Sequence, residues 1–211
     1  MSGRVAHLGD RAAADDPVTL DGKAIELHRE RGRPRVIAYH KPEGELVTRG
    51  DPQGRRTVFE RLPPLRGGRW IAIGRLDLNS SGLLLVTNAG ELANRLMHPR
   101  QGIEREYAVR VLGEMSEAIQ HRLLAGVTLD DGVARFEHLE ATGKSTGANR
   151  WFRVTLREGR NREVRRLFEA VGSRVSRLTR IRFGPVRLPR DLQPGRWTEL
   201  SSAEVRRLMS S

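Results

Sequence analysis

The stretch from Gly74 to Gly90 constrains the fold more than any other part of this chain. Its short polar segment, which carries Asp77, lies between two apolar runs: residues 70–73, directly before the stretch, and residues 83–86, within it. Apolar runs of this length bounded by turn residues are typical of buried β-strands. The pattern therefore predicts a strand, a loop and a second strand, with one carboxylate at a strand end next to the core.

The surroundings of Asp77 allow two interpretations. Arg75 precedes it by two residues, and an arginine beside a carboxylate keeps that carboxylate ionised. An ionised carboxylate that is shielded from water can act as a nucleophile. The alternative is a buried structural aspartate paired with an arginine, which has no role in chemistry.

The charge of the chain favours a polyanionic partner. Lys and Arg number 38 against 26 Asp and Glu, so the formal charge is +12, and nucleic acid is the commonest partner of such proteins. Arginine rather than lysine carries this charge, which suits bidentate phosphate contacts. Because aromatic residues make up only 5% of the chain, a long groove that stacks single-stranded bases is disfavoured. We expect a folded RNA with one or two bases bound individually.

Several other classes are disfavoured. No segment approaches the roughly 20 apolar residues that span a bilayer, so no membrane partner is expected. The absence of cysteine excludes disulfides and thiolate metal sites, and the six histidines show no ligand spacing, so no metal is expected. Residues 1–20 lack the apolar core of a signal peptide, and we expect a cytoplasmic protein.

Residues 1–33 are a polar segment ahead of the globular part, which we expect to span residues 34–211. Within the first segment, Val18 to Leu20 predict a short strand, and Asp21-Gly22 is a strong hairpin signal. Residues 31–34 are typical of a linker. The alternative for the whole segment is an unstructured basic tail.

The best helix prediction runs from a cap at Asn161 to Gly172. Four apolar residues within it fall at positions i, i+3, i+4 and i+7 and form one stripe. Arg162, Arg165 and Arg166 lie off the centre of that stripe near the N-terminal half, where cations oppose the helix dipole. Pairing with a carboxylate or a phosphate is the more natural role for them.

The remaining segments mix strands and short helices without strict alternation, which indicates an α+β fold with a largely antiparallel sheet. Residues 143–149 predict a hairpin loop, because their Gly-Lys-Ser lacks the earlier glycine of a phosphate-binding P-loop. Residues 49–56 predict a charged loop, either solvated or facing RNA. Strands are expected at residues 36–39, 106–111, 127–129, 133–137, 151–156 and 175–183, and helices at 91–97, 116–124 and from 202.

The stretch from Gly74 to Gly90 resembles the active-site motif of the RsuA/RluB-type pseudouridine synthases, which isomerise a chosen uridine in ribosomal RNA. The resemblance covers roughly residues 35–200 and includes two further motifs in the right order, at 104–109 and 158–166. It implies the pseudouridine synthase fold, a central mixed but mostly antiparallel sheet with flanking helices. It also implies that residues 1–33 are part of the alpha-L (S4-like) RNA-binding module that often precedes this domain, without its helical first half.

The resemblance assigns roles to individual residues. Asp77 corresponds to the catalytic nucleophile, with attack on the sugar or on the base both open. Tyr107 corresponds to the tyrosine that stacks on the target base, and Leu178 to an apolar residue of the base pocket; the alternatives are an ordinary strand tyrosine and plain core packing. Arg165 corresponds to the basic residue that pairs with the aspartate, with Arg162 as the alternative.

Arg75, Arg162, Leu178 and Lys41 are expected to contact the substrate. The sequence of these segments most resembles the branch of the family that acts on large-subunit ribosomal RNA. The expected partner is therefore 23S ribosomal RNA or an assembling large subunit, and the protein is expected to be a monomer. Isomerisation breaks the N1–C1′ bond and rejoins the base through C5 without redox chemistry. No cofactor is therefore expected.

Two other functions compete with this one. A non-catalytic basic protein that binds ribosomal RNA or assists ribosome assembly explains the charge equally well. Only an enzyme needs Asp77, Tyr107 and Arg165 to converge from distant parts of the sequence. An aspartate-dependent glycosidase would need a second catalytic carboxylate, and no motif offers one.

Overall fold

The computed structural model describes residues 17–25, 34–65, 67–146 and 149–210, together with Val5 and His7. The chain divides into two compact units, residues 1–33 and residues 34–211. No helix in the described part of the chain is long and apolar enough to cross a membrane.

The first unit contains an antiparallel hairpin of β1 (Val18–Leu20) and β2 (Lys23–Ile25). Asp21 and Gly22 both have positive φ, at 51° and 74°. This is the type I′ geometry for which Asp-Gly is a preferred pair, because it matches the twist of the strands. The predicted strand and turn are confirmed. Of the linker predicted at residues 31–34, residues 31–33 lie outside the described residues.

The second unit is built on one large sheet of the kind expected from the sequence. Its strands follow the order β13-β3-β5-β11-β6-β10-β9, with β4 beside β5 and β12 beside β11. Every pair is antiparallel except β11 with β5. The bounds are β3 (Val36–Lys41), β4 (Ile71–Ile73), β5 (Ser81–Thr87), β6 (Arg105–Leu112), β9 (His138–Thr146), β10 (Asn149–Leu156), β11 (Arg174–Phe183), β12 (Val186–Arg187) and β13 (Trp197–Glu199).

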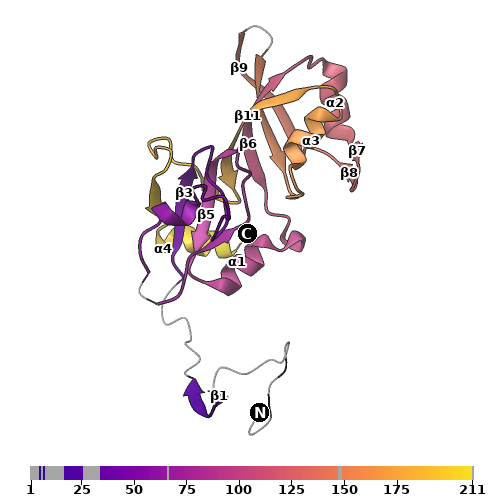
Figure 1. Ribbon diagram of the computed structural model, residues 1–211. Helices are drawn as coiled ribbons and strands as arrows, with labels where there is room; N and C mark the ends of the chain where they lie inside the picture. The colour runs from indigo at the N-terminus through magenta and orange to yellow at the C-terminus, as the bar shows by residue number, and fades with distance from the viewer. Residues whose placement is uncertain are drawn as a thin grey trace. The chain divides into compact units, whose positions relative to one another are not determined.

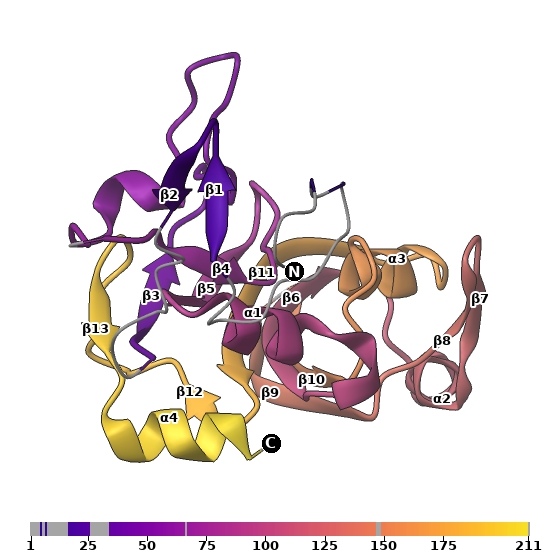
Figure 2. The same cartoon turned by 90° about the horizontal axis from the view of Figure 1, so that it is seen from below.

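Four α-helices flank this sheet in the described residues: α1 (Gly90–Met97), α2 (Glu117–Ala125), α3 (Glu163–Glu169) and α4 (Ser202–Met209). Two 3₁₀ turns, at Val58–Arg61 and Pro99–Gln101, and a separate hairpin of β7 (Val127–Leu129) and β8 (Gly132–Ala134) complete the unit. Figures 1 and 2 place α4 with β3 and β13, and place α2 and α3 near the β7–β8 hairpin, toward the other end of the sheet.

Strand β5 is buried on both faces, which explains its continuous apolar run. Leu84 and Val86 belong to one hydrophobic cluster, and Leu83 and Leu85 belong to a second one. Successive side chains of a strand point to opposite faces, so each face of β5 supplies two residues to one cluster. The strand after the Asp77 segment is therefore fixed from both sides.

The parallel pairing of β5 with β11 depends on a glycine. Gly82 faces Arg180 in this register and has a φ of 104°. A Cβ atom at Gly82 would lie 2.3 Å from the carbonyl oxygen of Arg180, far inside van der Waals contact. Only glycine lets the two strands approach this closely.

The helix predicted over residues 161–172 is shorter than expected. It begins at Glu163 because Arg162 adopts a left-handed conformation with φ 50°, so Asn161 is not its cap. The helix ends at Glu169, and turns follow it. The predicted apolar stripe nevertheless faces the core, where Phe168 packs 5.3 Å from Phe136 between ring centroids.

Two further predictions need correction. The loop expected at residues 143–149 is wrong for 143–146, which extend β9, and for Asn149, which begins β10; Thr146 pairs with Asn149 across an irregular register. The strand expected at 133–137 ends at Ala134, since the chain leaves the hairpin there and runs toward β9. The helices at α1, α2 and α4 are confirmed, and Ser116 caps α2 by accepting a hydrogen bond from the backbone of Ile119.

Candidate active site

A cavity of about 400 Å³ lies over the junction of β5, β6 and β11. The β4–β5 loop, the two strands β6 and β11 and the segment before α3 supply most of its lining. Five of the seven residues expected at the site from the sequence line it: Arg75, Asp77, Tyr107, Arg162 and Leu178.

Asp77 lies half-buried in the loop between β4 and β5, at the strand end expected from the sequence. Arg75 is exposed, and no ion pair joins it to Asp77 within the described residues. The expected direct pairing of these two side chains is therefore not formed, although both line the cavity.

Arg165, on α3, forms a hydrogen bond to the loop that carries Asp77. Its Nη2 donates to the carbonyl oxygen of Asn79 at 2.7 Å, and its Nη1 donates to that of Val175 at 3.0 Å. Burial lowers the pKa of Arg165, the positive charge of Arg162 lowers it further, and the negative charge of Asp77 opposes both. Arg165 thus lies in the field of Asp77 without forming a direct ion pair with it.

Arg162 is placed differently from Arg165. It lines the cavity, and its Nη2 lies 3.7 Å from a carboxylate oxygen of Glu169. Its guanidinium is partly exposed, whereas Arg165 is buried. Of the two arginines considered as partners of Asp77, Arg165 holds the loop and Arg162 faces the cavity.

Lys41, at the end of β3, is fully buried and does not line the cavity. Its ammonium group donates to the carbonyl oxygens of Pro42 at 2.9 Å and Ser80 at 2.8 Å, and approaches that of Leu78 at 3.5 Å. Burial lowers its pKa to about 8, while Glu45, Glu43 and Asp77 oppose that shift. The geometry supports a role for Lys41 in positioning the Asp77 loop rather than in contacting a substrate.

Tyr107 and Leu178 belong to the core and to the cavity at once. Both are nearly buried members of the larger hydrophobic cluster, and both line the cavity. In the antiparallel pairing of β6 with β11, Tyr107 lies opposite Arg180. A ring held this firmly in the core presents a rigid surface to anything that enters the cavity.

Five charged residues of the cavity were not foreseen as site residues from the sequence: Arg105, Glu158, Arg160, Glu163 and Arg180. Burial raises the pKa of Glu163, whose Oε2 accepts a hydrogen bond of 3.1 Å from the backbone of Arg160. Arg105 and Arg180 both lie over the ring of Phe183, at 5.2 and 5.4 Å. Because β11 carries four arginines, the sequence pattern does not reveal which of them is buried.

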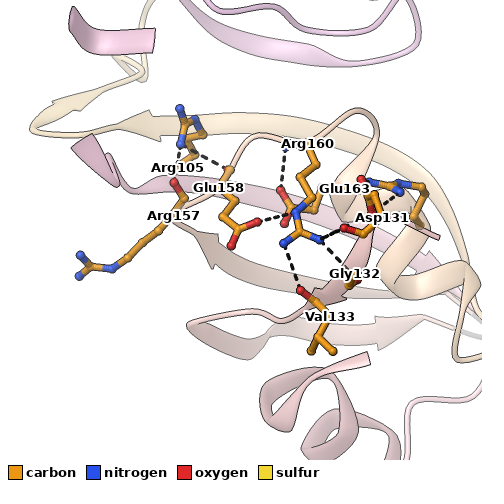
Figure 3. A network of polar contacts seen from close by, with 9 residues as sticks. Arg105, Asp131, Gly132, Val133, Arg157, Glu158, Arg160 and Glu163 are labelled. Atoms are coloured by element: carbon orange, nitrogen blue, oxygen red, sulfur yellow. Dashed lines mark hydrogen bonds and ion pairs between the residues drawn. The ribbon is translucent and has the colours of Figure 1, made fainter. Parts of the chain in front are cut away.

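The segment before α3 is anchored by Arg160 (Figure 3). Its Nε donates to Glu158 at 2.5 Å, and its Nη2 donates to the carbonyl oxygen of Val133 at 3.1 Å. Arg105 donates to the carbonyl oxygens of Arg157 at 2.8 Å and Glu158 at 3.3 Å. One wall of the cavity is thereby tied both to the β7–β8 hairpin and to β6.

The sheet that carries this cavity has the fold of a solved pseudouridylate synthase. The sequence profile of the family described as RNA pseudouridylate synthase matches residues 35–170, and the chain belongs to this family.

Relatives and solved structures agree with this assignment. The chain is 54% identical over 208 residues to ribosomal large subunit pseudouridine synthase B of Escherichia coli (strain K12), covering 97% of this chain and 71% of the relative. It is 55% identical over 203 residues to the protein of the same name from Yersinia pestis, covering 95% of this chain and 64% of that protein. A crystal structure described as pseudouridylate synthase has the same fold, with a TM-score of 0.73 at 23% identity over 94% of this chain and 83% of the other.

Proposed function

We propose that this protein isomerises one uridine of large-subunit ribosomal RNA to pseudouridine, with Asp77 as the catalytic carboxylate. The observation that carries the proposal is the convergence of Asp77, Tyr107 and Leu178 on one cavity, from parts of the chain up to 101 residues apart. The choice of RNA follows the relatives named ribosomal large subunit pseudouridine synthase B, to which the chain is 54% identical over nearly its whole length.

The chemistry requires the base to leave the sugar and return in another orientation. The N1–C1′ bond breaks, the uracil turns within the cavity, and C5 forms a new bond to C1′ as its proton is lost and N1 gains one. Asp77 would stabilise or capture the sugar or the base during this interval. Tyr107 would hold the detached ring flat, and Leu178 would help to keep water out.

The loop that carries Asp77 is preorganised for this role. Lys41 and Arg165 donate to the carbonyl oxygens of Ser80 and Asn79, so two buried cations fix the backbone directly after the aspartate. A carboxylate on a fixed loop does not need to be ordered when the substrate arrives, which lowers the barrier. We assign both side chains a positioning role.

The rest of the molecule fits an RNA substrate. A uridine inside folded RNA must be turned out of its stack at a cost of a few kcal/mol. Phosphate contacts made by a chain with a net charge of +12 offset that cost. We further propose that residues 1–33 contribute to RNA binding as part of an alpha-L module, and that the protein acts as a monomer.

Replacement of Asp77 by asparagine tests the proposal. Asp77→Asn is expected to abolish tritium release from ribosomal RNA labelled at C5 of uridine, while RNA binding stays within a few-fold, because the change removes the reactive charge and preserves the shape. Asp191→Asn is the matched control, since Asp191 is exposed and does not line the cavity. Normal tritium release by Asp77→Asn would contradict the assignment, and no release by the unaltered protein would favour a non-catalytic RNA-binding protein.

A further inference from the structure

The cavity contains a buried arginine, Arg180, which forms no ion pair with any carboxylate of the described residues. Arg180 is only 2% exposed. Its Nε donates to the carbonyl oxygen of Leu83 at 2.7 Å, and its Nη2 is buried with no partner in the described part of the chain. Removing an uncompensated charge from water costs several kcal/mol. Folds keep such a group mainly where it acts on a ligand.

The position of Arg180 places it beside the expected base. It lines the same cavity as Asp77 and lies directly opposite Tyr107 across the β6–β11 pairing. The other arginine over the Phe183 ring, Arg105, already donates to three backbone carbonyl groups. Arg180 is therefore the deeply buried cation of the cavity whose Nη2 has no partner in the described residues.

The backbone holds this side chain firmly. Gly82, five residues after Asp77, pairs with Arg180, and the strands approach so closely there that a Cβ atom would clash with the Arg180 carbonyl oxygen. The carboxylate loop and the arginine are thus joined through adjacent strands. A donor on such a rigid element needs no reorganisation during a reaction.

We propose that Arg180 is a catalytic residue that stabilises the negative charge which develops on the uracil as the N1–C1′ bond breaks. This inference rests on the proposed function. Whether Asp77 first bonds to the sugar or to the base, the electron pair of the broken bond stays with the base and spreads from N1 onto its carbonyl oxygens. When C5 bonds to C1′, the charge is discharged as the proton leaves C5 and another reaches N1.

The alternative ligand for Arg180 is a phosphate of the RNA. A phosphate diester keeps part of its hydration shell and suits exposed arginines such as Arg75. A guanidinium at 2% exposure beside Tyr107 suits the flat edge of a base that has left water. The two ligands also predict different effects, since a phosphate contact changes affinity and a contact with the departing base changes the rate.

The test compares uridine with 5-fluorouridine at the target position in single-turnover reactions at saturating enzyme. Fluorine withdraws electrons and makes the departing base a more stable anion, so a 5-fluorouridine substrate depends less on Arg180. The loss of N1-linked nucleoside is measured in digests of the RNA. Arg180→Gln is expected to slow cleavage at uridine by roughly 10²- to 10³-fold. The factor by which it slows cleavage at 5-fluorouridine is expected to be about ten times smaller.

Two variants complete the experiment. Arg180→Lys keeps the charge and should raise the ratio of the 5-fluorouridine cleavage rate to the uridine cleavage rate by only about threefold. If thermal unfolding shows that Arg180→Gln does not fold, this ratio for Arg180→Lys decides the test. Arg177→Gln is the matched control, an exposed arginine of the same strand outside the cavity, and should leave both rates unchanged.

The outcomes separate this inference from the proposed function. Equal slowing of both substrates by the Arg180 variants, or weaker RNA binding with unchanged rates at saturation, would overturn the role of Arg180 while the unaltered enzyme remains active. Absence of turnover by the unaltered protein would overturn the proposed function itself, and the role of Arg180 with it.

Discussion

Two buried cations hold the backbone beside Asp77, and they do so without direct contact with its carboxylate. Lys41 and Arg165 donate to carbonyl oxygens of the same loop, at Ser80 and Asn79. Carbonyl oxygens carry only partial charge, so the burial of these cations is compensated less than it would be by an ion pair. That is why burial lowers the pKa of both residues. The charged side chains of Lys41 and Arg165 therefore fix the conformation of the loop that carries Asp77.

The lowered pKa of Lys41 predicts a pH-dependent stability. Its pKa is about 8 in the folded protein and about 10.4 in an unfolded chain. Between these values the unfolded state binds more protons, so the contribution of Lys41 to the free energy of unfolding is lost as pH falls from about 10 to about 8. We expect the difference in unfolding free energy between the unaltered protein and Lys41→Met to grow by about 2 kcal/mol from pH 8 to pH 10.

Urea unfolding at several pH values measures this difference. Lys23→Met, at an exposed lysine of β2, serves as the control and should show a constant difference. A constant difference for Lys41→Met as well would mean that its amine is not perturbed by burial.

At the scale of elements, the junction of β5 and β11 organises the site. The β4–β5 loop carries Asp77, β11 carries Leu178 and Arg180, and β6 next to it carries Tyr107. The junction is the parallel pairing in an otherwise antiparallel sheet. The spacing of these cavity residues therefore depends on how closely the two strands approach.

Gly82 determines how closely β5 and β11 approach, so its replacement should destabilise the fold. Gly82→Ala is expected to cost about 3 kcal/mol or more, because alanine is strained at this positive φ and its Cβ would collide with β11. Thermal unfolding measures the loss. Gly90→Ala in the same motif is the control, since the nearest atom to its Cβ would be 3.7 Å away, and it should change stability by less than about 1 kcal/mol. Equal stability of the two variants would show that the strands can separate at little cost.

Most of the elements follow from local sequence patterns, and the exceptions have physical causes. The strand, loop and strand around Asp77 and the cap at Ser116 are as expected, because apolar periodicity and capping act over a few residues. The start of α3 was missed because Arg162 takes a left-handed conformation that is uncommon outside glycine and asparagine. The extension of β9 was missed because pairing with β10 overrides the turn signal of its Gly-Lys-Ser.

At the scale of the whole molecule, the positive charge determines how the protein meets its substrate. A net charge of +12 attracts RNA over distances of about a Debye length and releases counterions when the complex forms. The same arginines also form ion pairs on the surface, for example Arg35 with Glu199 and Arg55 with Asp51. Only the arginines without such partners are free to contact phosphate groups.

Binding of ribosomal RNA is accordingly expected to weaken steeply with salt. Contacts with about six phosphates would reduce the affinity roughly a thousandfold between 50 and 200 mM salt, because each contact releases counterions. Filter binding over a salt series measures the slope, and single-turnover rates at saturating enzyme serve as the control and should change little. A nearly flat dependence of affinity on salt would contradict recognition through the phosphate backbone.

The sequence alone determined the class of fold, the strand-loop-strand around Asp77 and the polyanionic partner, because periodicity, turn chemistry and net charge are local or additive properties. Only the tertiary structure decided that Lys41 supports a loop, and that Arg180 among the arginines of β11 is buried with no counter-ion in the described residues. Those outcomes depend on which strands become neighbours and how closely they pack, and no stretch of sequence encodes that by itself.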